Sequence, residues 1–329
     1  MNDDHATQRP GSDHRALWVR PYWAWPLRRA RAADLTGVTL RVATFKGFDE
    51  TLLPAAHLQN TPYHVVRRVH RRQFHCRGDE CRCRRSRLME RNPHWPSPPP
   101  RVRTCAPWRW RKGDVNRQAV IVPKGSTISS IAELKGKRVG YVRATTSQYY
   151  LLKMLRQVGL GFGDITPVNL SPTDGRAAFQ SGVLDAWAIY GYAIDFAIEQ
   201  DGARVLKNAV GILSGNYLIG ARPAALTDPI LHATIADYLT RLRHAYDWAE
   251  ANKAEYARLE SKAVGVPETF IRNGLATESQ RYQLVPIDDA AVASCQDVAD
   301  VFAGAGLLPG HVNVAPYFDR SFSSLLAQS

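Results

Sequence analysis

The residues that could bind a metal ion gather in the stretch HCRGDECRCRRSR, which contains Cys76, Cys81 and Cys83. With His70 or His75, these thiolates could supply the four ligands of a structural zinc ion. Structural zinc sites usually combine two sets of ligands, each with about two to four residues between its cysteines. Here the spacings are C-x4-C and C-x-C, and no second set follows. The spacing therefore predicts no metal site, and we expect no other cofactor.

The same region holds most of the positive charge of the chain. The chain has 329 residues and a formal net charge of +13. Fourteen arginines and only three acidic residues lie between residues 67 and 111, with four of the five cysteines. A basic arm that binds nucleic acid would have this composition. It would, however, interrupt a chain that otherwise has the pattern of one fold, so we expect no nucleic-acid partner.

Residues 67–111 also have the composition of coding DNA translated in a shifted frame. GC-rich DNA out of frame yields arginine, proline, cysteine and tryptophan codons. Suitable codons for residues 67 onward, shifted by one base, read VEFTAGNFIVEAMNAGAVD, and a second shift near Trp95 leads back to Lys112. We therefore interpret 67–111 as frameshifted. We expect this segment to be irregular, largely exposed to solvent and damaging to the domain that contains it.

The N-terminus can be interpreted in the same way. Residues 16–29, ALWVRPYWAWPLRR, can be re-read as ALGAALLGLAAAAG, the apolar core of a secretory signal peptide. This core would directly precede Ala30-Arg31-Ala32, which has the small-x-small pattern of a cleavage site. We interpret residues 1–32 as a degraded signal peptide, and we expect the chain as written to remain in the cytoplasm.

The rest of the chain alternates between short strands and helices. Strands are predicted at 39–44, 118–123, 138–142, 165–170, 186–190 and 216–221. A long amphipathic helix is predicted across Leu231–Tyr246. This alternation favours a parallel sheet with helices packed against it. No apolar run reaches the roughly 18 residues that a membrane-spanning helix needs.

Three stretches resemble a known family: SIAELKGKRVGYVRATTSQYYLLKMLRQVGL, ITPVNLSPTDGRAAFQSGVLDAWAIY and SGNYLIGARPAALTDP. They resemble the nitrate/sulfonate/taurine-type substrate-binding proteins of ABC importers, and most of all those that bind aliphatic sulfonates. The resemblance covers nearly all of residues 33–65 and 112–329. It extends to the re-read text of 67–111, where E-F-x-x-G-N and E-A-M-N-A-G-A-V-D-x-G are typical of the family.

The resemblance implies an α/β type II periplasmic binding fold, in which two lobes enclose a ligand cleft. The expected parts are lobe one at 33–122, damaged by the aberrant 67–111, lobe two at 123–215, and the return of lobe one with C-terminal helices at 216–329. Two crossover strands would join the lobes near Gln118–Pro123 and Asn216–Ala221.

The resemblance also implies a function. The chain would be a periplasmic, monomeric substrate-binding component that delivers a small anion of the alkanesulfonate, taurine or nitrate class to an ABC permease at the membrane. Thr145, Thr146 and Ser147 follow a predicted strand and begin a helix. Free N–H groups and the helix dipole favour an anion there. The same three residues could instead serve only as helix caps.

Other candidate ligand-binding residues lie near the expected cleft. Trp187 and Tyr190 end a predicted strand and would line the tail of the ligand, or else pack in the core. Gly47 and Phe48 follow the first strand, where a glycine lets the backbone approach a ligand closely; the alternative is a plain turn. Asn216, near the second crossover, is a further candidate.

Two other classes of function remain open. The first is an enzyme on the same fold, similar to proteins of pyrimidine-precursor biosynthesis. It would need a reactive group in the cleft, and Cys295 lies in a segment predicted to be helical and buried. The second takes the chain literally, as a basic protein that binds zinc or nucleic acid. No catalytic constellation is evident in the sequence, so we expect a binding protein.

Overall fold

The computed structural model describes residues 34–44, 47, 49–69, 106–308 and 310–323. The predicted signal peptide, Phe48 and most of the predicted frameshifted segment therefore lie outside the described residues. The elements below belong to one unit of the chain, which begins at Leu35.

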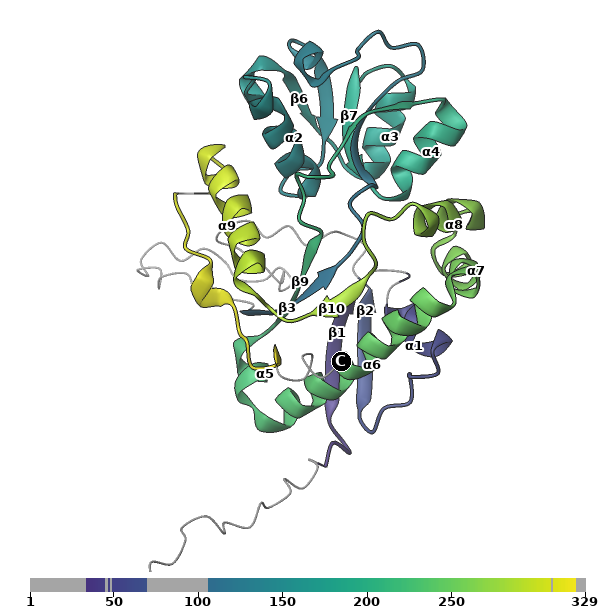
Figure 1. Ribbon diagram of the computed structural model, residues 1–329, viewed down its shortest axis with the longest axis vertical. Coiled ribbons are helices and arrows are strands. Elements are labelled where there is room, and N and C mark those ends of the chain that lie inside the picture. The colour runs from purple at the N-terminus through teal and green to yellow at the C-terminus, as the bar shows by residue number, and fades with distance from the viewer. Residues whose placement is uncertain (1–33, 45–46, 48, 70–105, 309, 324–329) are drawn as a thin grey trace, which may run out of the picture. The chain divides into compact units, whose positions relative to one another are not determined.

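One group of elements is built on a five-stranded sheet, at the top of Figure 1. The sheet has the order β6-β5-β7-β4-β8. Its strands are β4 (Gln118–Val122), β5 (Arg138–Tyr141), β6 (Thr166–Asn169), β7 (Ala186–Tyr190) and β8 (Arg204–Asn208). β5 runs parallel to both β6 and β7, but β4 runs antiparallel to β7 and β8. The prediction of a parallel sheet is therefore wrong for β4 alone, which enters the sheet from the other group of elements and runs opposite to the other four strands.

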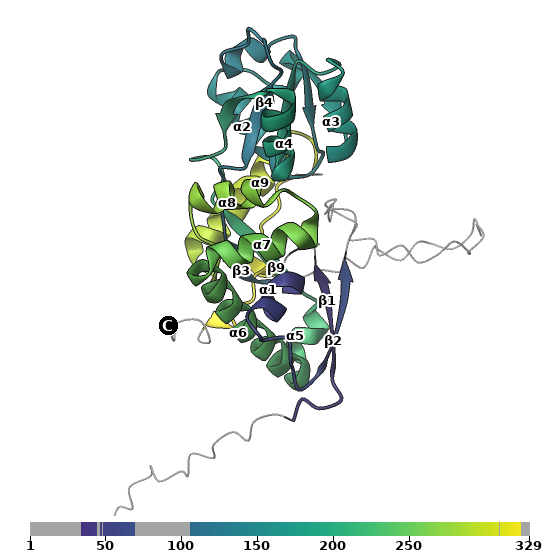
Figure 2. The same cartoon turned by 90° about the vertical axis from the view of Figure 1, so that its right-hand side faces the viewer.

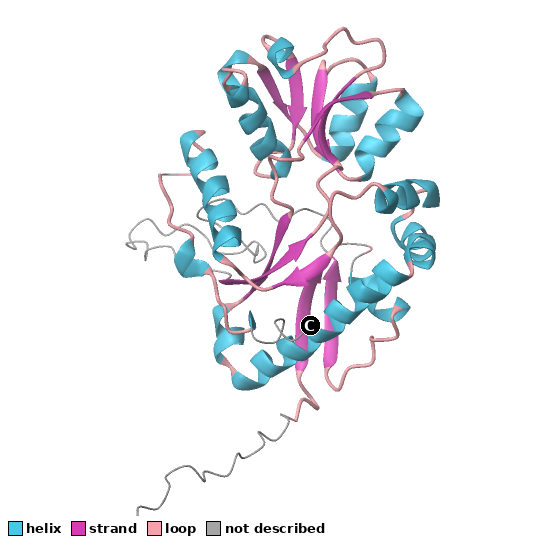
Figure 3. Cartoon of the chain, in the orientation of Figure 1, coloured by secondary structure: helices cyan, strands magenta, loops and turns pink. Residues whose placement is uncertain are grey.

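Helices pack on both faces of this sheet (Figure 3). They are α2 (Thr146–Gln157), α3 (Pro172–Gln180) and α4 (Tyr192–Asp201), with the short 3-10 helices η1 (Ile131–Leu134) and η2 (Phe162–Asp164). Ala186 and Ala188 of β7 pack in one apolar cluster with α2, whereas Trp187 and Ile189 pack in another with α3 and α4. This alternation follows from the two-residue period of a strand. Because helices cover both faces of the sheet, residues on both sides of a central strand are buried, and β4 is buried along its whole length.

The second group of elements contains two smaller sheets. β1 (Thr39–Thr44) and β2 (His64–Val69) form a parallel pair. β10 (Gln283–Val285), β3 (Ala106–Lys112) and β9 (Asn216–Ala221) form an antiparallel sheet in the order β10-β3-β9. The helices of this group are α1 (Asp49–Ala55), α5 (Pro223–Thr227), α6 (Pro229–Ala251), α7 (Lys253–Val264), α8 (Glu268–Ala276) and α9 (Asp289–Gly304), followed by η3 (Ala315–Tyr317).

The long helix α6 organises the core of this group. Its Ile235, Leu239 and Leu242 pack in one cluster with Leu53 of α1 and Leu284 of β10. The predicted amphipathic stripe accounts for this packing, because residues three and four apart share one helix face.

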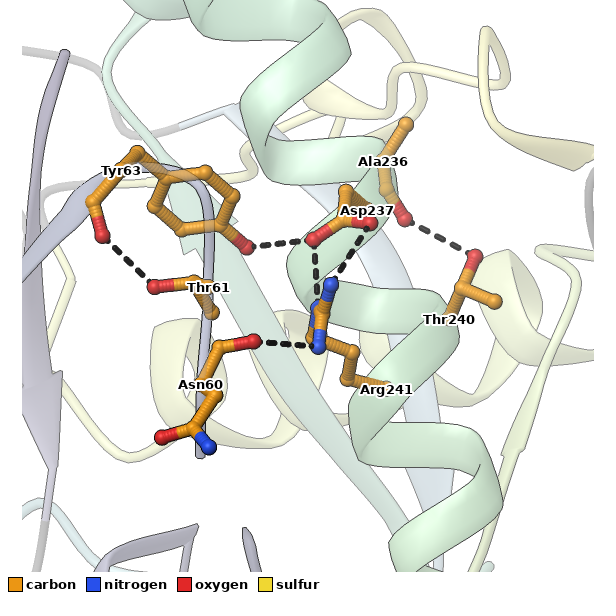
Figure 4. A network of polar contacts seen from close by, with 7 residues as sticks. All are labelled: Asn60, Thr61, Tyr63, Ala236, Asp237, Thr240 and Arg241. Carbon is orange, nitrogen blue, oxygen red and sulfur yellow. Dashed lines mark hydrogen bonds and ion pairs between the residues drawn. The ribbon is translucent and has the colours of Figure 1, made fainter. Parts of the chain in front are cut away.

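A polar network also ties α6 to the loop before β2 (Figure 4). Tyr63 donates a hydrogen bond to Asp237 Oδ2 at 2.8 Å, and Arg241 Nε donates to the same oxygen at 2.6 Å. Arg241 also donates to the carbonyl of Asn60 at 2.9 Å. The loop is therefore fixed to the helix by a charged pair as well as by apolar contacts.

The segment 67–111 departs from expectation at both of its ends. Arg67 and Arg68 belong to β2, and residues 106–111 belong to β3, which pairs with two strands. The prediction that these residues are irregular is therefore wrong. Trp108 to Arg111 alternate between tryptophan and arginine, a two-residue period that suits a strand. Pro107 is tolerated because the register of β3 shifts beside it. The intervening residues 70–105 lie outside the described part of the chain.

The chain passes between the two groups through residues 113–117, between β3 and β4, and through 209–215, between β8 and β9. The predicted crossovers at Gln118–Pro123 and Asn216–Ala221 form the adjoining strands β4 and β9. Gly113 N donates to Gly215 O at 3.0 Å, so the two passing segments are joined directly. Figure 2 shows the same two groups from a second direction.

Candidate functional site

A cavity of about 580 Å³ is lined by residues from both groups of elements. The first group supplies the start of β4, the beginning of α2 and the junction of β7 with α4. The second group supplies parts of α1, α6, α7 and α8 together with Tyr282. A cavity of this size matches the volume of ordinary small-molecule sites.

The beginning of α2 forms one wall of this cavity. Thr145 and Thr146 both line it. Thr145 has an extended backbone and its hydroxyl donates to the carbonyl of Val142 at 2.7 Å, while the Thr146 hydroxyl donates to Gln118 Oε1 at 2.7 Å. Because the first N–H groups of a helix have no acceptor within the helix, this wall presents backbone donors. The arrangement can hold an anionic group.

Ser147 has a different position from its two neighbours. Its side chain is fully buried, and its oxygen accepts a hydrogen bond from Val142 N at 3.0 Å. Ala144 N in turn donates to Gln148 Oε1 at 2.7 Å. Ser147 therefore fixes the turn that leads into α2, and it is not among the described residues that line the cavity.

Tyrosines form much of the remaining wall. Tyr190 lines the cavity at the end of β7, as does Tyr192 at the start of α4. Tyr246, Tyr256 and Tyr282 line it from the second group. Burial raises the pKa of Tyr192 to about 12, helped by the nearby Glu260 carboxyl. These rings offer broad apolar faces to a ligand.

Arg117 is the basic side chain among the described residues that line the cavity. Its guanidinium lies 3.3 Å from Asp195, stands 4.9 Å from the centre of the Tyr192 ring, and donates to the carbonyl of Phe270. Arg117 thus already has a carboxylate partner, and it connects α4 to α8.

Glu260 of α7 is the most unusual acid in the lining. Its exposed fraction is 5%, and its Oε2 has no hydrogen-bond partner within the described chain. Burial raises the pKa of Glu260 to about 8, against the opposing effect of a hydrogen bond with Thr51. By contrast, Glu278 is held by Lys253 at 2.7 Å, and Asp114 accepts from both Ser279 N and Ser279 Oγ at 2.9 Å.

Three other predicted residues do not line the cavity. Trp187 has no exposed surface and packs against Phe179, with ring centres 5.7 Å apart. Asn216 Nδ2 donates to Ser294 Oγ at 2.9 Å, and the Asn216 Oδ1 is buried without a partner in the described chain. Gly47 is buried with a φ of 94°, and a side chain there would overlap Glu260 Oε1 and Val264. Phe48 lies outside the described residues.

The residues that sequence reasoning missed are Arg117, Glu260 and the tyrosines of the second group. A usable signal existed for Glu260. It shares a face of α7 with Tyr256, Ala257 and Val264 at helical spacing. An acid in such an apolar stripe is rarely buried without a reason.

The described part of the chain has neither a metal-binding cluster nor a helix that could span a membrane. No group of three or more histidine, cysteine, aspartate or glutamate side chains there could hold a metal ion. The cysteines of the predicted zinc alternative lie outside the described residues. No described helix is both long enough and apolar enough to cross a membrane.

Comparison with known proteins relates this architecture to binding proteins. Residues 114–209 match the family model described as NMT1/THI5 like. Over 198 residues the chain is 33% identical to a putative aliphatic sulfonates-binding protein of Escherichia coli. This alignment covers 60% of the chain and 61% of that relative.

Two solved structures show the fold. The periplasmic aliphatic sulphonate binding protein SsuA from Escherichia coli matches with a TM-score of 0.68 and 24% identity, covering 84% of this chain and 90% of that one. The desulfurization enzyme DSZB matches with a TM-score of 0.57 and 14% identity, covering 87% and 97%. The predicted α/β periplasmic binding fold is therefore confirmed. Residues 114–209 thus match the NMT1/THI5-like family model, and the described chain has the fold seen in the sulphonate-binding structure.

Proposed function

We propose that this chain is the substrate-binding component of an importer and that it binds an aliphatic sulfonate, or a similar small anion, in the cavity. The observation that carries the proposal is the beginning of α2, where Thr145 and Thr146 form a wall of the cavity. The sequence similarity to a putative aliphatic sulfonates-binding protein supports the choice of anion.

The chemistry of a sulfonate suits this wall. A sulfonate remains ionised at physiological pH, and a buried charge without donors is costly. Helix N-terminal N–H groups and the helix dipole stabilise an anion by about 0.3–2 kcal/mol per charge, depending on exposure. The two threonine hydroxyls can rotate to donate to a ligand oxygen, because a hydroxyl is both donor and acceptor.

The opposite walls suit the organic part of such a ligand. Tyr190, Tyr246, Ile271 and Leu275 line the cavity with largely apolar surface. Burying an alkyl tail there contributes about 0.8 kcal/mol per methylene. Ligand would stabilise the arrangement in which both groups of elements contact it, since a ligand shifts a population only by differential affinity. We propose that this liganded form docks on an ABC permease in the periplasm, and that the protein acts as a monomer.

The first prediction tests the α2 wall. Replacing Thr145 and Thr146 together by alanine should weaken binding of butanesulfonate by about tenfold or more, because hydrogen bonds to a charged group contribute about 1.5–3 kcal/mol. Isothermal titration calorimetry on the two proteins measures this change. Ser171→Ala is the matched control, because Ser171 caps α3 by accepting from Asp174 N and is not among the described cavity residues. If the double variant folds and binds with unchanged affinity, the two threonines serve only as helix caps.

An enzymatic role needs a reactive group in the cavity. Cys295, the one described cysteine, packs beside Ile287 and Ala291 instead. Burial raises the pKa of its thiol, which weakens it as a nucleophile. We therefore propose binding rather than catalysis. Release of sulfite from an aliphatic sulfonate or an aryl sulfinate, lost in Cys295→Ser, would support the enzymatic alternative.

A further inference from the structure

The cavity lining contains more acidic than basic side chains. Its described lining includes four acidic side chains and one basic side chain: Asp114, Glu250, Glu260, Glu278 and Arg117. Lys253 offsets part of the negative charge, because it pairs with Glu250 at 2.9 Å and with Glu278 at 2.7 Å. Arg117 is paired with Asp195. A purely anionic ligand would therefore share the cavity with carboxyl groups that lack a full complement of cations.

Glu260 has a buried carboxyl oxygen that no described residue pairs. Thr51 hydrogen-bonds to its side chain, whereas Oε2 has no partner in the described chain. A buried polar atom without a hydrogen-bond partner is unfavourable, and buried polar atoms usually have a partner. Because Glu260 lines the cavity, a bound molecule can supply the missing partner.

The surroundings of Glu260 are aromatic. Its charge acts on Tyr192 of α4 and on Tyr256 of α7, and Tyr256 also interacts with Tyr246 and Tyr282. Burial raises the pKa of Glu260 and the hydrogen bond with Thr51 lowers it, and no described cationic side chain contributes to the shift. The backbone of Gly47 lies close to Glu260 Oε1. A carboxylate beside aromatic faces is the chemistry that binds an ammonium group.

We propose that Glu260 receives a cationic group of the ligand, so that the cavity takes zwitterionic sulfonates, with the sulfonate at the beginning of α2 and a protonated amine at Glu260. This rests on the proposed function and narrows its ligand class. A zwitterion adds no net charge to a cavity whose lining is already rich in carboxyl groups, whereas a purely anionic ligand adds one negative charge.

The assignment has a consequence for proton exchange. Near pH 7 the Glu260 carboxyl of the free protein is mostly protonated, because burial raises its pKa to about 8. An ammonium group beside it stabilises the carboxylate and lowers that pKa. Binding of an amine ligand near pH 7 therefore releases close to one proton, whereas an alkyl ligand of the same size releases none.

The test uses ligand pairs in which an amine replaces a methyl group: taurine with propanesulfonate, and homotaurine with butanesulfonate. Calorimetry on the full chain should show the amine ligand binding about tenfold or more tightly in at least one pair. In Glu260→Gln this ratio of affinities should fall to near one. Glu255→Gln, an exposed position on the same helix, should keep the ratio.

The outcomes separate the two proposals. If no member of either pair binds, the proposed function fails and the present assignment fails with it. If butanesulfonate and propanesulfonate bind as tightly as their amine partners, or if Glu260→Gln keeps the preference, only the Glu260 assignment is overturned. Should Glu260→Gln fail to fold, titrations of the wild type in buffers of different ionisation enthalpy decide. Proton release confined to the amine ligands supports the assignment, and equal release overturns it.

Discussion

The backbone of Gly47 packs closely against the side chain of Glu260, which lines the cavity. The φ of 94° at Gly47 lies in the region that only glycine adopts without strain. A β-carbon there would also overlap Glu260 Oε1 and Val264. The glycine thus meets two requirements, one of backbone conformation and one of space.

We therefore expect Gly47→Ala to lower the free energy of unfolding by about 2–4 kcal/mol, from strain and overlap combined. Urea unfolding measures the change. Gly37→Ala is the control, because Gly37 also has a positive φ, of 78°, but has no atom within 4 Å of an added β-carbon. Equal losses in the two variants would show that overlap with Glu260 contributes nothing.

The protonation of Glu260 predicts how stability depends on pH. Its pKa in the folded chain, about 8, is raised above the ordinary value of 4.5, so the folded chain holds this proton more tightly than the unfolded chain does. The contribution of Glu260 is therefore most favourable below about pH 4.5 and is lost progressively as the pH rises toward 8. Glu260→Gln should flatten this decline in urea unfolding measured across that range. An equal decline in the wild type and the variant would argue against the raised pKa.

At the scale of elements, α2 was predictable and β3 was not. Thr145 and the apolar spacing of Leu151, Met154 and Leu155 are local signals, and the helix forms at Thr146–Gln157. The prediction for β3 rested on the arginine-rich composition of the segment and was wrong. The alternation of tryptophan and arginine in Trp108–Arg111 has the two-residue period of a strand. The apolar stripe of α7 could indicate that Glu260 is buried, but not that it lines the cavity, because that depends on α1, α4 and α7 meeting around it.

A contact between α9 and α2 helps to hold the helix whose beginning forms a wall of the cavity. Asp297 of α9 accepts hydrogen bonds from Tyr149 and, at 2.7 Å, from Lys153, both on α2. We expect Asp297→Ala to lower the free energy of unfolding by about 1 kcal/mol, because it removes a partly exposed ion pair and the partner of a tyrosine. Thermal or urea unfolding checks this, with Asp247→Ala, an exposed acid of α6, as the control. A loss no larger than that of the control would contradict a role for Asp297 in docking α9 on α2.

At the scale of the whole molecule, the unusual composition of 67–111 remains to be explained. We predict that resequencing the gene will reveal one extra base, or two missing bases, near codons 67, 95 and 111, and a further change within codons 1–30. The change expected near codon 111 is the most informative, because residues 106–112 as written form β3 and pair with two other strands. Clean reads that reproduce the present frame would contradict the frameshift. Zinc content and salt-dependent DNA retention would then test the literal alternative.

The link between Gly113 and Gly215 has a mechanical consequence. Gln280 Nε2 donates to Gly113 O at 2.9 Å and to Ser214 O at 3.4 Å, so a third segment is bound to the two that pass between the groups of elements. A β-carbon on Gly215 would lie 2.7 Å from Gly113 O, so these strands can approach this closely only without a side chain. Sliding one segment along another would break several of these bonds at once, so the joint resists shear between the segments that pass from one group to the other.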